Sequence, residues 1–240
     1  MTDPQPDFAP RPGVPETIAP GIRRILAPNP SSMTFRGTNT YVVGQGGLAV
    51  IDPGPDDEAH LAAILAGVAP GQAITHILVT HAHLDHSPLA RRLGARTGAP
   101  VLAFGPPEAG RSALMQRLAA SGGLSGGEGV DTSFAPDREL VDGEIVTGDG
   151  WQLEALHLPG HMANHLGFAT EGRLFSGDLV MGWASSLISP PDGDLRAFMQ
   201  SLDRLRARDW TCFLPGHGAP VPDPTTRVEA LRTHRLARET

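Results

Sequence analysis

Residues 81–86 read His81-Ala82-His83-Leu84-Asp85-His86, and this H-x-H-x-D-H hexad follows the apolar run Ile77-Leu78-Val79 with only Thr80 between them. Imidazole nitrogens and carboxylate oxygens are the ligands that first-row divalent metals, zinc foremost, take from a protein without thiolates. In an extended segment the side chains at positions 81 and 83 point the same way, whereas those at 85 and 86 need a turn to reach inward. Four donors within six residues therefore predict two neighbouring metal ions rather than one.

Three further candidate donors stand at loop tips, each after a short apolar segment that ends in Gly or Pro-Gly. They are His161 after Pro159-Gly160, Asp178 after Gly177, and His217 after Pro215-Gly216. A glycine beside a metal ligand lacks a Cβ and adopts backbone angles closed to other residues, so the chain can bend close to an ion.

Composition bounds the class of protein. The 240 residues are 40% hydrophobic and contain no apolar run near the ~18 residues of a membrane span, which predicts one soluble domain and no membrane partner. The chain has 19 Arg and no Lys, which excludes a Schiff base or a lysine general base. The net charge of −7 gives no global basic face for nucleic acid.

The first twenty residues, Met1 to Pro20, are rich in proline and lack the apolar segment of a secretory signal. We therefore expect residues 1–20 to form a flexible arm and the protein to be cytoplasmic. The oligomeric state does not follow from the sequence.

Strand and helix patterns alternate along the rest of the chain, which predicts an α/β protein. Strands are expected at Ile22–Leu26, Thr40–Val43, Leu48–Ile51, Ile74–Val79, Val101–Phe104, Leu153–Leu158, Leu166–Ala169, Arg173–Ser176 and Thr211–Leu214. Helices are expected at Asp56–Val68, Pro88–Thr97, Glu108–Ala120 and Asp194–Ala207. The Gly-rich stretch Ser121–Gly129 predicts a mobile loop.

These motifs resemble those of the metallo-beta-lactamase-fold hydrolases, in that superfamily's order from Asp52 through the hexad to His217. The resemblance implies a four-layer αββα sandwich that holds two zinc ions per chain. It implies that one zinc is held by His81, His83 and His161, that the other is held by Asp85, His86 and His217, and that Asp178 bridges the two. Asp52, at the end of Val50-Ile51-Asp52-Pro53-Gly54, would shape the site from behind the ligands.

A finer resemblance, to the beta-lactamase-like protein 2 branch, rests on Gly37 to Gly44, on Phe175-Ser176-Gly177-Asp178 and on Pro190-Pro191-Asp192-Gly193. That branch often continues into a winged-helix-like region. Residues 21–222 would then form the metallo-hydrolase domain. Residues 223–240 would be either an ordinary C-terminal helix or the start of a truncated winged-helix-like region.

Two positions depart from the superfamily's usual pattern. Ser87-Pro88 stands where two glycines usually follow the hexad, and Met162 stands where a threonine often follows His161. Neither change removes a ligand, and proline suits the first turn of a helix. The loss of the threonine hydroxyl removes a group that can orient a neighbouring ligand.

The chemistry of such a site is hydrolysis. Two cations that share a carboxylate can lower the pKa of a bridging water and present hydroxide to an ester, thioester, amide or phosphodiester, with Asp85 orienting that nucleophile. The branch resemblance implies either an endoribonuclease on single-stranded RNA or a hydrolase of a small ester or thioester. A glyoxalase-II-like thioesterase is a further alternative, and a mononuclear-iron dioxygenase of the same fold is another.

The residues that select the substrate are expected beside the ligands. His165, four residues after His161, is a candidate for contact with a substrate oxygen or a ligand. Phe35, Arg36, Trp183 and Leu187 are candidates for the walls of the cleft, because they lie in Gly- or Pro-marked segments next to the ligand-bearing loops.

Overall fold

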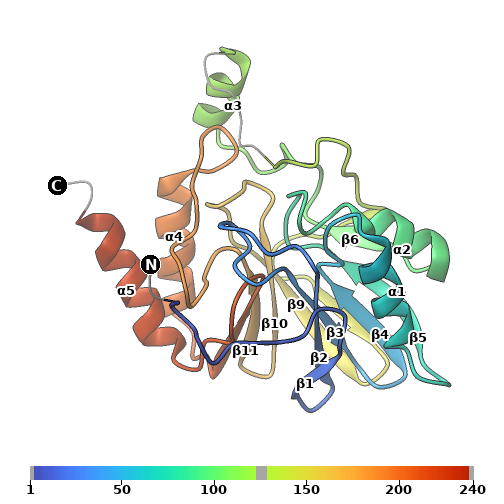
Figure 1. Cartoon of the computed structure of the whole chain (residues 1–240). Coiled ribbons are helices and arrows are strands. Elements are labelled where there is room, and N and C mark those ends of the chain that lie inside the picture. The colour runs from blue at the N-terminus through green and yellow to red at the C-terminus, as the bar shows by residue number, and fades with distance from the viewer. Residues whose placement is uncertain (1–2, 123–128, 238–240) are drawn as a thin grey trace.

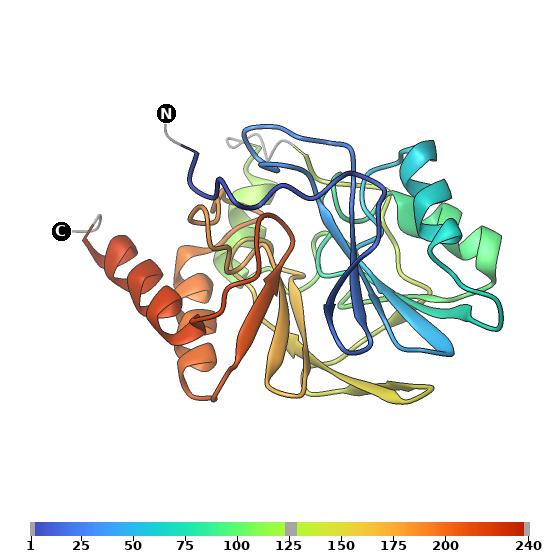
Figure 2. The ribbon, with the colours of Figure 1, turned by 60° about the horizontal axis from the view of Figure 1, so that its bottom comes forward.

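Two β-sheets pack face to face, and helices cover their outer surfaces (Figures 1 and 2). The computed structural model describes residues 3–122 and 129–237. The seven-stranded sheet runs in the order β1 (Glu16–Ala19), β2 (Ile22–Leu26), β3 (Asn39–Val43), β4 (Gly47–Ile51), β5 (Ala73–Leu78), β6 (Val101–Ala103) and β7 (Arg138–Glu139). The five-stranded sheet runs in the order β12 (Cys212–Pro215), β11 (Arg173–Gly177), β10 (Leu166–Thr170), β9 (Trp151–His157) and β8 (Ile145–Gly148).

The helices lie on two opposite sides of this pair of sheets. α1 (Glu58–Ala66) and α2 (Leu89–Thr97) cover the first sheet, whereas α4 (Leu195–Arg206) and α5 (Pro224–Leu236) cover the second. α3 (Ala113–Ala120) projects from the body (Figure 1). No helix among the described residues is long and apolar enough to cross a membrane.

The buried apolar side chains form three clusters that follow these layers. The middle cluster lies between the sheets and contains large side chains such as Tyr41, Phe168 and Phe175. One outer cluster joins the first sheet to α1 and α2. The other joins the second sheet to α4 and α5. The order helix, sheet, sheet, helix confirms the predicted four-layer α/β sandwich.

Most helices begin where the sequence supplies a cap. The side chains of Asp57, Asp194 and Asp223 accept backbone N–H groups of the first turns of α1, α4 and α5. α2 instead follows Pro88, as expected for a proline at a helix start, and ends at Gly98 in the left-handed conformation.

Several sequence expectations need correction. Residues 3–20 do not form a loose arm: β1 pairs with β2, Phe8 is buried, and the guanidinium of Arg24 lies over the Phe8 ring. α3 begins at Ala113 rather than at residue 108, with Ser112 as its cap. The short strands β1, β7 and β8 were not expected. Within the predicted loop 121–129, residues 123–128 lie outside the described part of the chain.

The strand directions gather the carboxyl ends of β4, β5, β9, β11 and β12 at one edge of the sandwich. β4 and β5 are parallel, as are β11 and β12, and β9 runs parallel to β11 because each is antiparallel to β10. In α/β sheets this edge is where ligands bind.

Gly160 is a position at this edge that does not tolerate a side chain. Its φ is +150°, and an added Cβ would lie 2.4 Å from Cα of Phe198 in α4. Because the obstacle is backbone, neither partner can move aside without shifting a helix. His161 follows directly, so this contact fixes where that imidazole leaves the chain.

We expect Gly160→Ala to lower the free energy of unfolding by about 4 kcal/mol, from backbone strain and overpacking together. Gly150→Ala is the matched control, since Gly150 also has a positive φ of +76° but has no atom within 4 Å of an added Cβ. It should cost about 1 to 2 kcal/mol. Chemical denaturation of both variants measures the difference, and equal losses would contradict the steric argument.

Candidate metal centre

Seven side chains from four loops converge at the carboxyl edge of the strands. The loop after β5 supplies His81, His83, Asp85 and His86, the loop after β9 supplies His161, the loop after β11 supplies Asp178, and the loop after β12 supplies His217. All seven residues that the sequence singled out as donors therefore lie together.

Three imidazoles form one half of this centre. Nε2 of His81 and Nε2 of His161 each lie 3.0 Å from Nδ1 of His83. Burial, followed by the neighbouring His161, lowers the pKa of His83 to about 3. Burial, followed by His86 and His83, lowers the pKa of His81 well below its usual value. These two rings are therefore neutral at pH 7 and turn nitrogen atoms toward a common point, as a divalent cation requires.

The other half combines Asp85, His86 and His217. Oδ2 of Asp85 lies 3.0 Å from Nε2 of His217 and 3.5 Å from Nε2 of His86, and the two imidazole nitrogens are 3.2 Å apart. Burial alone would lower the pKa of His217, but Asp178 and Asp85 outweigh it and raise that pKa to about 9. Burial is likewise outweighed at His86, whose pKa the same two carboxylates raise well above its usual value. Both imidazoles therefore hold a proton at pH 7 beside these carboxylates.

Asp178 lies between the two halves. Its Oδ2 is 3.3 Å from Nε2 of His217 and 3.8 Å from Nε2 of His161, and its Oδ1 is 3.5 Å from Nε2 of His86. Oδ1 is buried and accepts no hydrogen bond. Because an unpaired buried carboxylate oxygen is costly, this atom fits a metal ligand that touches both sides.

The donor set as a whole fits two cations. Within each of three groups the ligand atoms lie inside 4.8 Å of one another, and the groups share members. The groups are His81, His83 and His161; His81, His86 and Asp178; and Asp85, His86 and His217.

Asp52 supports these donors from behind, as the sequence indicated. Its carboxylate accepts the backbone N–H and the hydroxyl of Thr80, both at 2.7 Å, and lies 2.9 Å from Nδ1 of His86. Asp52 itself has a φ of +49°, which is uncommon for a residue with a side chain. These contacts stabilise the strained backbone of Asp52, and the contact with Nδ1 orients His86 toward the centre.

A buried histidine that the sequence gave no reason to select supports Asp52 in turn. Nε2 of His60, on α1, lies 2.8 Å from Oγ1 of Thr40, and that hydroxyl donates to the carbonyl of Asp52 at 2.7 Å. Since the hydroxyl has one hydrogen, His60 must be the donor to it. Burial lowers the pKa of His60 to about 4, so the ring is neutral at pH 7.

His165 does not reach the face of the centre where a substrate could bind. The ring is fully buried, and its Nε2 accepts the backbone N–H of Asp178 at 3.2 Å. An added Cβ at Gly177 would lie 2.6 Å from that same nitrogen. Of the two contacts expected for His165, with a substrate oxygen or with a ligand, the structure shows the second, because the ring supports the loop that carries Asp178.

A cavity of about 360 Å³ opens beside the centre, with His161 and Asp178 in its lining. Its other lining groups are mostly apolar and include Met33, Met181 and Trp183. Met33 and Leu187 are 58% and 55% exposed, so the rim offers apolar surface to a ligand. Arg235, from α5, is the one basic side chain in this lining.

The predicted wall residues divide into two groups. Trp183 and Leu187 line the cavity, as expected. Phe35 stands one layer back and stacks on Trp183, with ring centroids 5.0 Å apart. Arg36 turns away and donates to the carbonyl of Phe8 at 2.9 Å, so it does not form a wall. Met33 and Arg235 were missed, because neither lies next to a ligand in the sequence.

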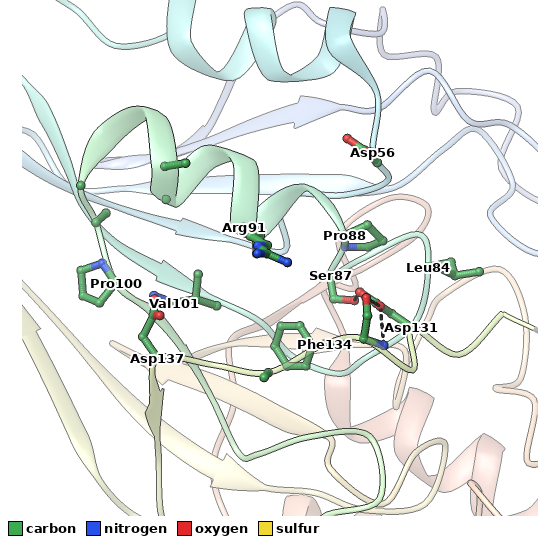
Figure 3. Close-up of a pocket in the computed structure, with 17 residues that line it drawn as sticks. Asp56, Leu84, Ser87, Pro88, Arg91, Pro100, Val101, Asp131, Phe134 and Asp137 are labelled. Carbon is green, nitrogen blue, oxygen red and sulfur yellow. Dashed lines mark hydrogen bonds between the residues drawn. The ribbon is translucent and has the colours of Figure 1, made fainter.

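A second, larger cavity of about 880 Å³ lies between α2 and residues 131–137 (Figure 3). At its edge the Ser87 hydroxyl donates to the Asp131 carboxylate at 2.9 Å, and Figure 3 shows these two side chains next to each other. None of the seven donors lines it. We therefore place the reaction at the smaller cavity. Ser87, one of the two departures noted in the sequence, thus packs the hexad loop against the segment at 131.

Comparison with known proteins agrees with this geometry. The family profile described as the metallo-beta-lactamase superfamily matches residues 33–217. The chain therefore belongs to the metallo-beta-lactamase superfamily.

Among individual relatives, the Beta-lactamase-like protein 2 homolog of Drosophila melanogaster is 31% identical over 92% of this chain and 72% of its own length. This confirms the resemblance to that branch. Atrochrysone carboxyl ACP thioesterase AgnL7 of Paecilomyces divaricatus is 29% identical over 94% of this chain, which spans 63% of the length of that thioesterase.

Solved structures show the same fold. The metallo-beta-lactamase family protein TTHA1429 from Thermus thermophilus aligns with a TM-score of 0.74 at 27% identity, over 92% of this chain and 81% of its own. TTHA1623, solved in a di-iron-bound form, aligns with a TM-score of 0.61 at 29% identity, over 82% and 93%.

The neutral, buried His60 predicts a pH dependence of stability. Its pKa falls from 6.5 in the unfolded chain to about 4 in the folded one, so the unfolded state binds more protons between these values. Stability is therefore retained above pH 6.5 and lost as the pH falls toward 4, by about 3 kcal/mol for this group.

His60→Gln keeps an N–H donor for Thr40 but cannot titrate. We expect its free energy of unfolding, measured in chelator from pH 7 to pH 4, to fall less steeply than that of the wild type. Parallel pH profiles for the two proteins would exclude His60 as the titrating group.

Proposed function

We propose that this chain is a dinuclear metal-dependent hydrolase that cleaves an acyl thioester or a related ester, with zinc as its metal. The observation that carries the proposal is the cavity of about 360 Å³, because it places apolar walls directly beside two residues of the seven-donor centre. An apolar wall with few polar groups suits the acyl part of a substrate.

In this proposal His81, His83 and His161 hold one ion, Asp85, His86 and His217 hold the second, and Asp178 bridges them. When bound, two such ions supply Lewis acidity and lower the pKa of water to a useful value. Because TTHA1623 was solved in a di-iron-bound form, the metal content of the purified protein is measured for both zinc and iron.

The protein's own groups position the nucleophile. Asp85 is the more accessible of the two carboxylates, with 27% of its side chain exposed against 10% for Asp178. Burial raises the pKa of Asp85, but His86 and His217 outweigh burial and lower it well below the usual value. Asp85 is therefore ionised at pH 7 and suited to orient an attacking water.

The charge of the chain favours a thioester or ester substrate over an RNA phosphodiester. The net charge is −7 and the chain has no lysine, so arginines alone could neutralise the phosphates of a polyanion and release its counterions. Arg235 is the one basic side chain in the lining of the cavity. Thioesterase relatives point the same way.

A single panel separates the candidates. The purified chain is loaded with zinc, its metal content is measured, and it is assayed on a thioester, a lactone, a β-lactam and a single-stranded RNA. We expect two metals per chain and the highest kcat/KM on the thioester or the lactone. RNA cleavage at a higher kcat/KM would assign the endoribonuclease instead. One iron per chain with oxygen consumption would assign a mononuclear dioxygenase. The cytoplasmic setting stays a prediction.

Asp178→Ala should abolish hydrolysis more completely than His217→Ala, because a bridging carboxylate serves both ions and His217 serves one. We expect fewer than two metals in each variant and at least about tenfold lower kcat for Asp178→Ala. Asp209→Ala, an exposed carboxylate before β12, is the control and should retain both metals. Two metals and normal turnover in Asp178→Ala would reject the bridge.

Trp183→Ala tests the substrate wall. Loss of its contact with an acyl group should lower kcat/KM roughly tenfold, since burial of a large apolar side chain is worth about 1.5 to 3 kcal/mol. Metal content should stay at two. Trp210→Ala is the matched control, because that indole donates to the carbonyl of Leu205 in α4, away from the cavity. The same kcat/KM in both variants would indicate that Trp183 serves only in packing and does not contact the substrate.

A further inference from the structure

The C-terminal helix α5 contacts the cavity wall through two arginines eight residues apart. Arg227 donates from Nε to the carbonyl of Met181 and from Nη2 to that of Ala184, both at 2.6 Å. Arg235 donates from Nη2 to Oγ of Ser185 at 2.8 Å and to the carbonyl of Ser186. We call residues 181–188 the wall loop.

The wall loop in turn holds two members of the metal centre. Nδ1 of His161 donates to the carbonyl of Leu187 at 2.6 Å, which leaves Nε2 free to face His83. The hydroxyl of Ser186 donates to the carbonyl of Asp178 and, at 2.8 Å, to that of Leu179. The loop has no regular secondary structure, so these bonds and those from α5 fix its path.

We propose that Arg235 is a positioning residue for the hydrolytic site: it fixes the end of the wall loop so that the Leu187 carbonyl sets the tautomer and orientation of His161. This inference rests on the proposed metal-dependent function. The path runs from the Arg235 guanidinium to Ser185 and Ser186, then through one peptide bond to Leu187, then to the His161 ring.

The two arginines are expected to have different effects because they contact different residues of the wall loop. Arg227 contacts residues 181 and 184, which flank Trp183, so its loss should act on the apolar wall. Arg235 contacts residues 185 and 186, next to the carbonyl that holds His161. Loss of a hydrogen bond to the second nitrogen of a metal-binding imidazole typically lowers metal affinity about 10- to 100-fold.

A simpler role for Arg235 is packing, since its guanidinium also lies over the Phe198 ring, 5.5 Å from the centroid. That role predicts a loss of global stability without a selective effect on one metal. Arg232 provides the matched control on the same helix, because it pairs with Asp203 and Glu229 rather than with the wall loop.

The experiment compares wild type, Arg235→Met and Arg232→Met by zinc titration against a chromophoric chelator. We expect the wild type to bind two zinc ions, Arg232→Met to match it, and Arg235→Met to bind one of the two about 10- to 100-fold more weakly. In the metal-free proteins, hydrogen exchange of the amides of residues 185–188 should be faster in Arg235→Met alone.

A double-mutant cycle with His161→Ala identifies the route. If Arg235 acts through His161, then Arg235→Met should add no further loss of zinc affinity in the His161→Ala background. Ser185→Ala, which removes one acceptor without altering α5, should weaken the same zinc in the same direction and serves if Arg235→Met does not fold.

The failures are distinguishable. A wild type that binds one zinc would overturn the proposed dinuclear function. A wild type that binds two zinc ions, together with equal affinities in the Arg235 and Arg232 variants or additive losses with His161→Ala, would overturn the role of Arg235 alone.

Discussion

The convergence of five imidazoles and two carboxylates in a buried space is the constraint on which the rest of this structure depends. Without a cation, one part of the cluster takes up protons and the other stays neutral, as the raised pKa of His217 and the lowered pKa of His83 show. Both states cost free energy. The protonated imidazoles and the carboxylates are charges taken out of water, and the neutral imidazoles leave nitrogen lone pairs facing one another. The two sheets, their aligned strand ends and the tight glycine at 160 hold the donors together against that cost.

The sequence predicted the fold where the pattern is local and strong. Strands β4, β5 and β11 are short, largely apolar segments. They are followed within two residues by Asp52, Thr80 and Asp178, so both the strand and the turn after it can be recognised in the sequence. Prediction from the sequence failed where strand pairing or side-chain packing determines the local structure. β8 and β1 carry exposed residues and form because β9 and β2 offer an edge for pairing. Phe8 holds residues 3–20 in place because its ring packs against the Arg24 guanidinium and the Phe35 ring, contacts that no local pattern indicates.

The same division holds at the centre. The donors were predictable because four of them form the hexad and each of the other three directly follows a glycine. The role of His165 was not, because a histidine four residues from a ligand can turn toward the substrate or away from it. Packing against Gly177 and Asp178 decides for the second. Arg235 could not be predicted for a different reason: its partners are the Ser185 hydroxyl and the Ser186 carbonyl, some fifty residues away, and a backbone carbonyl carries no signature in a sequence.

Metal binding and substrate selection are usually assigned to separate parts of such a scaffold, with ligands on the strand ends and walls on the loops. Here the wall loop does both, because Ser186 holds the carbonyl of Asp178 while Leu187 holds His161. A change in this wall therefore also changes how the donors are oriented. Arg227 and Arg235 of α5 fix the loop at residues 181, 184, 185 and 186, which leaves side chains such as Met33 and Trp183 as the positions where the lining can vary without disturbing the donors.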